Sequence, residues 1–211
     1  MNIHTILFDL DGTLIDTNEL IIESFIHTFQ HYGKKLAREE AIEFIGPPLK
    51  DTFLQYNPVQ AESMMETYRE HNKKHHDDYV TAFPNVLKTI DRLHQKNIQL
   101  GIVTTKLRGT VGMGLRVTQL DSYFKTVITL DDVTCAKPHP EPVIKAMNEL
   151  GASPESTLMV GDNSHDIEAG RNAAVKTAAV SWSLKDREKL LAYKPTYMLD
   201  DMQDLLKITE V

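Results

Sequence analysis

Short apolar runs alternate with segments of helical periodicity over the second half of the chain. In the helical segments apolar residues recur every three or four positions, as at Val143, Met147 and Leu150, after which Gly151 is a suitable helix end. The apolar runs predict five buried strands, at residues 5–8, 100–103, 126–128, 157–160 and 177–180. Strands and helices in alternation are typical of a parallel sheet with right-handed crossovers. We therefore predict an α/β fold, a Rossmann-like parallel sheet flanked by helices.

Residues 16–82 have a different pattern, which is helical and contains no convincing strand. Asp16 and Glu19 have the spacing of a capping box at the start of a helix. Helical periodicity continues in the stretches 38–44 and 64–76. We therefore expect a small α-helical cap, residues 16–82, inserted after the first strand. The expected core consists of residues 1–15 and 83–211.

Composition and charge narrow the class of protein. The chain has 211 residues, of which 41% are hydrophobic and 25% charged, which is typical of a soluble globular protein. Its formal net charge of -7 argues against a dedicated nucleic-acid binder. No apolar run has the length of a membrane span, and no signal peptide is evident. With one cysteine, Cys135, the chain fits a reducing compartment, so we expect a cytoplasmic protein.

Polar residues come directly after several of the predicted strands. Asp9 and Asp11 come after the first strand and Thr104 after the second. Asp162 comes after the fourth, and Lys137 lies in a loop that leads into a helix. Ligands of an open parallel sheet bind at the carboxyl ends of its strands. We therefore expect these side chains to lie close together at one edge of the sheet.

Phosphoryl transfer is the chemistry that this set of side chains could share. A carboxylate at the end of a buried strand is costly unless its charge is compensated. Mg²⁺ binds carboxylate, water and substrate oxygens, and Asp9 and Asp162 are its candidate ligands. Asp166 is an additional or outer-sphere candidate. Lys137 and Thr104 would neutralise and hydrogen-bond the transferring group.

Asp9 and Asp11 can have different roles in phosphoryl transfer. An aspartate can attack phosphorus and form an aspartyl-phosphate. Asp11 points toward the same site as Asp9 only if the strand ends between them, and Gly12 allows that change of direction. Asp11 would then give a proton to the leaving group and later take one from water.

Four motifs resemble those of the haloacid dehalogenase-like (HAD) phosphatases, over essentially the whole chain. They are DLDGT at 9–13, the strand-terminal Thr104, Lys137 before Pro138, and GDNSHD at 161–166. The resemblance implies that Asp9 is the nucleophile and Asp11 the general acid and base. The resemblance also implies that Thr104, Thr105 and Lys137 bind the phosphoryl group. It implies that Mg²⁺ is bound by Asp9, Asp162, Asp166 and the backbone carbonyl of Asp11.

Longer stretches resemble one subgroup, the bacterial HAD-type inorganic pyrophosphatases that accompany the HPr kinase/phosphorylase. These stretches are IGPPLKDTF at 45–53, GIVTTK at 101–106, VITLDDV at 127–133 and MVGDNSHDI at 159–167. The resemblance implies that the substrate is pyrophosphate, released when seryl-phosphorylated HPr undergoes phosphorolysis. Because pyrophosphate is small and polar, we expect cations around it, Lys50 from the cap and Lys106 from the core.

Other functions remain open from the sequence. One is a small-molecule phosphatase of the phosphoglycolate type, and another is a sugar-phosphate mutase, which needs a cap that excludes water. A third is a non-catalytic phosphate-sensing protein, although the intact Asp9, Asp11, Lys137 and Asp162 argue against lost catalysis.

Overall fold

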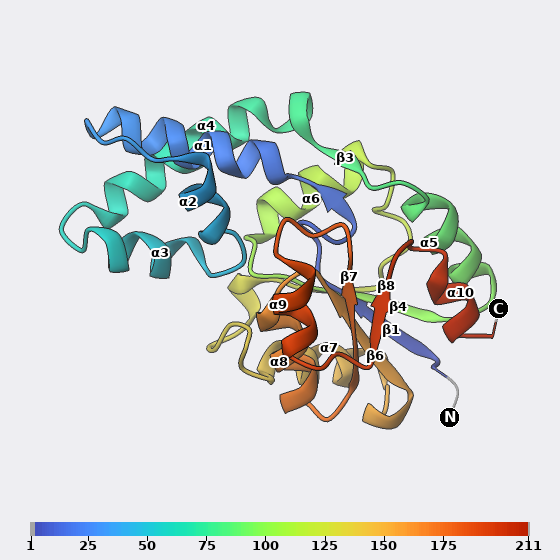
Figure 1. Cartoon of the computed structure of the whole chain (residues 1–211). Coiled ribbons are helices and arrows are strands. Elements are labelled where there is room, and N and C mark those ends of the chain that lie inside the picture. Colours follow the sequence, from blue (N-terminus) through green and yellow to red (C-terminus); the bar gives the residue numbers. More distant parts are fainter. Residues whose placement is uncertain (1–2, 211) are drawn as a thin grey trace.

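A six-stranded parallel sheet forms the centre of the computed structural model, which describes residues 3–210 (Figure 1). Its strands are β1 (Thr5–Phe8), β4 (Gln99–Val103), β5 (Thr126–Ile128), β6 (Thr157–Gly161), β7 (Lys176–Val180) and β8 (Tyr197–Leu199). They are arranged in the order β5-β4-β1-β6-β7-β8, and every neighbouring pair is parallel. The predicted fold is therefore confirmed, with β8 as an additional strand that the sequence pattern did not reveal.

Helices cover both faces of this sheet. They are α5 (Val86–Gln95), α6 (Arg108–Val117), α7 (Glu141–Leu150), α8 (Ser164–Asn172), α9 (Arg187–Ala192) and α10 (Asp204–Ile208), with short 3-10 turns at Leu130–Asp132 and Pro154–Ser156. Along β1, Leu7 packs with the residues of α7 and α8, whereas Ile6 and Phe8 pack with those of α5, α6 and α10. Successive side chains of a strand point to opposite faces. The first strand is therefore buried on both sides and fixes the position of the residues at its carboxyl end.

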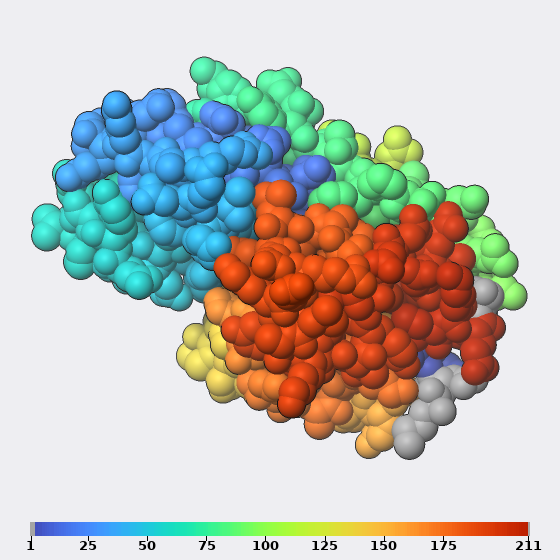
Figure 2. Space-filling view, in the orientation of Figure 1, coloured from blue at the N-terminus to red at the C-terminus, as the bar shows by residue number. Residues whose placement is uncertain are grey.

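Four helices, α1 (Asn18–His31), α2 (Arg38–Glu43), α3 (Leu49–Tyr56) and α4 (Ala61–Tyr79), form a separate layer above the carboxyl edge of the sheet (Figure 1). They share a hydrophobic cluster of their own, centred on Phe25, Phe29 and Phe53. The space-filling view shows this group as a lobe that touches the sheet domain (Figure 2). We call residues 16–82 the cap; its boundaries stay a prediction, which this packing supports.

Two expectations about the cap were wrong. Its ends do contain strands, because β2 (Ile15–Asp16) pairs antiparallel with β3 (Thr81–Ala82). These strands are too short to produce a detectable alternation. The capping box is absent as well: the Asp16 carboxylate accepts from the Asn18 backbone N–H at 3.1 Å, and Glu19 accepts from Arg38 instead. A long-range ion pair thus replaces the local contact that the spacing indicated.

Candidate active site

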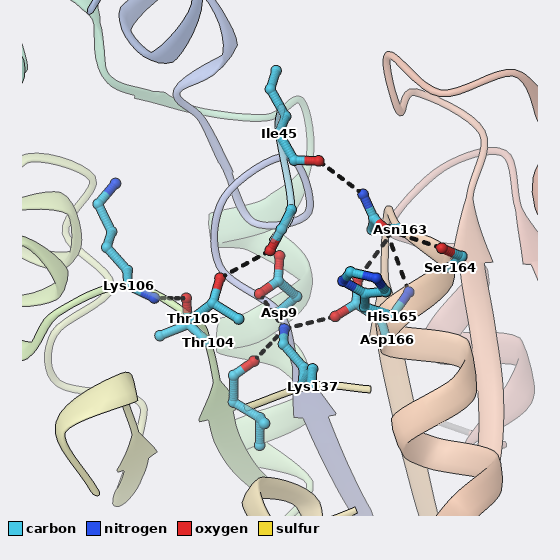
Figure 3. A network of polar contacts seen from close by, with 12 residues as sticks. Asp9, Ile45, Thr104, Thr105, Lys106, Lys137, Asn163, Ser164, His165 and Asp166 are labelled. Atoms are coloured by element: carbon cyan, nitrogen blue, oxygen red, sulfur yellow. Dashed lines mark hydrogen bonds and ion pairs between the residues drawn. The ribbon is translucent and has the colours of Figure 1, made fainter. Parts of the chain in front are cut away.

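The carboxyl edge of the sheet brings Asp9, Thr104, Lys137 and Asp166 together beneath the cap (Figure 3). Asp9 lies directly after the central strand, and its backbone N–H still donates to Val160 of β6 at 2.8 Å. Thr104 ends β4 in the same way, with a bond to Ile128 of β5. Asp162 lies directly after β6. Adjacent parallel strands therefore place these side chains next to one another.

Lys137 is the centre of a buried polar network. Its Nζ donates to Asp9 Oδ1 at 2.7 Å, to Asp166 Oδ1 at 2.6 Å and to the Val103 carbonyl at 2.9 Å. Only 4% of the residue is exposed. Although burial lowers the pKa of Lys137, Asp166 and Asp9 raise it above its ordinary value. The lysine is therefore a fixed positive charge between two carboxylates.

Three buried carboxylates, those of Asp9, Asp162 and Asp166, offer oxygen atoms that lie within 4.8 Å of one another. Burial raises the pKa of Asp9 to about 7 in spite of Lys137, and the Asp166 charge adds to the increase. Burial and the charge of Asp9 likewise raise the pKa of Asp162 well above its usual range. A buried cluster with one lysine and three carboxylates has an unmet need for positive charge. Its donor set fits a hard cation such as Mg²⁺.

A second cluster of potential metal ligands in the described part of the chain contains sulfur and nitrogen as well as oxygen. Cys135, His139 and Glu141 also bring potential ligand atoms within 4.8 Å of one another, but Cys135 and His139 are exposed. Both oxygens of Glu141 already accept backbone N–H bonds, from Thr134 and Cys135. Sulfur and nitrogen are poor ligands for Mg²⁺. The buried carboxylates are therefore the candidate magnesium centre.

Gly12 makes room for this centre. Its φ is +79°, and a Cβ at this position would lie 2.5 Å from Asp162 Oδ2. Glycine adopts this conformation without strain. The same residue turns the chain after Asp11, as the sequence indicated, and lets the backbone approach the Asp162 carboxylate.

Replacing Gly12 by alanine should therefore displace Asp162. We expect the Mg²⁺ concentration for half-maximal activity to rise about 10- to 100-fold, as for other changes that misplace a ligand. Gly33→Ala is the matched control, because Gly33 has a φ of +69° but nothing within 4 Å of the added Cβ. Mg²⁺ titrations of both variants test the expectation, and an equal response of the two would contradict it.

Asp11 lies apart from the carboxylate cluster, on the side that faces the cap. Its Oδ1 accepts from Lys106 Nζ at 2.6 Å and from Thr17 Oγ1 at 2.7 Å. Asp9 and Asp11 both line the cavity between the core and the cap. Sequence reasoning did not identify Thr17, because the bond joins residues on either side of the turn at Gly12 and not within one helix or strand.

The two threonines after β4 have different partners. Thr104 is buried, and its Oγ1 accepts from the Lys106 backbone N–H at 3.1 Å. The Thr105 hydroxyl donates to the carbonyl of Gly46 in the cap at 3.2 Å. Both residues line the cavity, so their assignment to the phosphoryl group stays a prediction.

The cavity has a volume of about 720 Å³ and is lined by these residues on one side and by residues of the cap on the other. Its cap wall includes three exposed cations, Lys50, Arg69 and Lys73, as well as the aromatic residues Phe25 and Tyr68. Sequence reasoning identified Lys50 but missed Arg69 and Lys73. Their spacing of four positions on α4 could have indicated that they share one helix face.

The comparisons with known proteins agree with this geometry. Residues 6–180 match the family described as haloacid dehalogenase-like hydrolase. Pyrophosphatase PpaX of Anoxybacillus flavithermus is 58% identical over 100% of this chain and 99% of its own length. Pyrophosphatase PpaX of Oceanobacillus iheyensis is 56% identical over 99% of this chain and 97% of its own.

A solved structure shows the same fold. A hydrolase of the haloacid dehalogenase-like family from Streptococcus pneumoniae superimposes with a TM-score of 0.87 at 25% identity, covering 97% of both chains. Within residues 3–210, no helix combines the length and apolar character needed to cross a bilayer. On the family match, the full-length relatives and the shared fold, the chain belongs to the haloacid dehalogenase-like hydrolases and is a phosphohydrolase.

Proposed function

We propose that this protein hydrolyses inorganic pyrophosphate to phosphate through an aspartyl-phosphate on Asp9, with Mg²⁺ as cofactor. The observation that carries the proposal is the buried cluster of Asp9, Asp162 and Lys137 beneath a cavity whose cap wall bears cations. Pyrophosphate presents negative charge on both the transferred and the leaving group, so it needs cations on both sides. The names of the full-length relatives support the same substrate.

Asp9 and Asp11 would perform the two covalent steps. A carboxylate oxygen of Asp9 attacks phosphorus, and the bond from phosphorus to the leaving phosphate oxygen breaks. Asp11, held by Lys106 and Thr17, donates a proton to that oxygen. Asp11 then takes a proton from the water that attacks the aspartyl-phosphate, which restores both carboxyl groups.

The cation would be held by Asp9, Asp162 and the backbone carbonyl of Asp11. When bound, it supplies positive charge that offsets the charge developing on the phosphoryl oxygens. Both Asp166 oxygens already accept bonds, from Lys137 and from the Asn163 backbone N–H at 3.0 Å. This pairing favours an outer-sphere role for Asp166, which orients Lys137 and the start of α8.

A small-molecule phosphatase is the second candidate, because aromatic side chains share the cavity with the cations. Phe25, Phe44 and Tyr68 would contact the carbon skeleton of an organic leaving group. A panel of kcat/KM values for pyrophosphate, 2-phosphoglycolate and glucose 1-phosphate separates the candidates. A preference for either organic ester would overturn the pyrophosphatase proposal.

Replacing Lys50 by alanine should raise the KM for pyrophosphate by roughly three- to tenfold, the loss of one charge-assisted contact at an exposed site. The KM for an ester with an uncharged leaving group, such as phenyl phosphate, should change little. Lys74→Ala is the matched control, since Lys74 is also an exposed cap lysine but does not line the cavity. An unchanged KM for pyrophosphate would remove Lys50 from the site.

The protein thus takes a small phosphorylated substrate. Two further statements stay predictions: the supply of pyrophosphate by phosphorolysis of seryl-phosphorylated HPr, which the family resemblance implies, and a cytoplasmic location.

A further inference from the structure

We propose that three core side chains, Thr105, Asn163 and Lys185, are positioning residues that hold the cap over the active site. Each donates to a carbonyl of one short cap segment, residues 42–46 (Figure 3 shows two of the donors). We call this set of three bonds the latch. It joins parts of the chain that are far apart in sequence, and none of its side chains forms or breaks a bond in the proposed hydrolysis of pyrophosphate.

The three bonds cover the end of α2 and the loop after it. Lys185 Nζ donates to the Ile42 carbonyl at 2.7 Å, and Asn163 Nδ2 donates to the Ile45 carbonyl at 3.1 Å. Thr105 Oγ1 donates to the Gly46 carbonyl at 3.2 Å. Only the Ile42 carbonyl belongs to α2, and it also accepts from the Ile45 backbone N–H at 3.2 Å. The carbonyls of Ile45 and Gly46 lie in the loop after the helix, where the core supplies their side-chain donors.

Gly46 allows the cap segment to come this close. Its φ is +113°, and a Cβ on it would lie 2.3 Å from Asn163 Nδ2. Asn163 is only 8% exposed, so this contact is buried. A side chain at position 46 would push the cap segment away from Asn163. The close approach therefore depends on glycine at this position.

Two of the latch residues are tied to the segment that carries the candidate magnesium ligands. Asn163 lies between Asp162 and Asp166, and its Oδ1 accepts from the His165 backbone N–H at 3.3 Å to cap α8. The Ser183 hydroxyl donates to the Asp162 carbonyl at 2.7 Å and accepts from the Lys185 backbone N–H at 2.9 Å. The cap segment is thus fastened to the same segment that positions the carboxylates.

The latch also determines where the cap wall of the cavity lies. Ile45 and Gly46 line the cavity themselves, and Lys50 comes four residues later at the start of α3. If the latch opens, the segment that carries Lys50 can move away from the cavity that Asp9 also lines. This consequence rests on the proposed function, whereas the fastening of the cap does not. The two can therefore be tested separately.

The first test measures the position of the cap without substrate. Thr105→Val removes a hydroxyl at constant shape, Asn163→Ser keeps a helix-capping oxygen but cannot reach Ile45, and Lys185→Met removes the amine. We expect faster deuterium uptake in peptides covering residues 42–56 for each variant. Thr105→Ser should restore slow uptake, and Lys189→Met, on the exposed face of α9, should leave it unchanged. Uptake like that of the wild type in all three variants would overturn the latch.

The second test measures substrate binding. Each latch variant should raise the KM for pyrophosphate by about three- to tenfold, with a smaller change in kcat, because it loses one hydrogen bond and, for Lys185→Met, also the ion pair with Glu43 at 3.5 Å. The effect of Thr105→Val should not add to that of Lys50→Ala, because the first already displaces the second. Full additivity would overturn the coupling to Lys50.

If Asn163→Ser changed only the Mg²⁺ requirement and not deuterium uptake, Asn163 would act through α8 and not through the cap. Absence of pyrophosphate hydrolysis by the wild type would refute the proposed function and leave the first test intact.

Discussion

Asp9→Asn protein should hydrolyse pyrophosphate at least about 10⁴-fold more slowly than the wild type, since the amide cannot form the aspartyl-phosphate. Asn has nearly the same shape, and Lys137 keeps its bonds to Asp166 and Val103. The loss should therefore be chemical and not structural. Phosphate release from pyrophosphate at saturating Mg²⁺ measures it, and acid-stable labelling of the wild type with radioactive phosphate should be absent in the variant.

The free energy of unfolding of Asp9→Asn protein shows whether the loss of activity comes from the chemistry or from unfolding. Because burial raises the pKa of Asp9 to about 7, the folded protein keeps a proton there that the unfolded chain releases. The contribution of this carboxyl to the free energy of unfolding therefore falls as the pH rises from about 4 to 7. Asn removes that titration, so metal-free Asp9→Asn protein should be no less stable than the wild type at pH 8. Retention of more than a few per cent of the activity in a folded variant would exclude Asp9 as the nucleophile.

Replacing Lys137 by methionine should destabilise the protein by about 3–5 kcal/mol, the usual cost of removing one partner from a buried ion pair. The variant leaves Asp9, Asp162 and Asp166 without the amine that two of them contact. Urea denaturation in the absence of Mg²⁺ measures the loss. Hydrolysis of pyrophosphate should fall as well, because the same amine would neutralise the transferring group.

Mg²⁺ should restore part of that stability, since a bound cation replaces some of the missing positive charge. Lys189→Met is the matched control for the loss of an exposed lysine and should change the free energy of unfolding by less than about 0.5 kcal/mol. Equal stability of Lys137→Met and wild-type protein would show that the carboxylates do not depend on Lys137.

The sheet and the catalytic edge could be predicted because their signals are local. The strand before Asp9 is an uninterrupted apolar run, and the chemistry of a parallel sheet lies where such runs end. The fold then brings Thr104, Lys137 and Asp162 together without any information on their contacts. Lys137 could be named from its motif, but its pairing with Asp166 depends on the three-dimensional position of α8.

The cap was less predictable, because its contacts are long-range and its signals ambiguous. Asp16 and Glu19 have the spacing of a capping box, yet Arg38 takes the Glu19 carboxylate. The spacing of Arg69 and Lys73 indicates a shared face of α4, but only the position of α4 in the fold shows that this face lines the cavity. The bond from Thr105 to Gly46 joins two loops, and no periodicity reports such a contact.

The pairing of β2 with β3 has a consequence for the evolution of the chain. Ile15 lies opposite Ala82 and Asp16 opposite Thr81, so the chain leaves the core and returns to it at neighbouring points. Because the two ends of the cap segment lie next to each other, the segment can be lengthened or exchanged with little added loop-closure entropy for the core. Recombination at these two points could therefore supply a new leaving-group pocket in one event, while the strand that carries Asp9 stays in register.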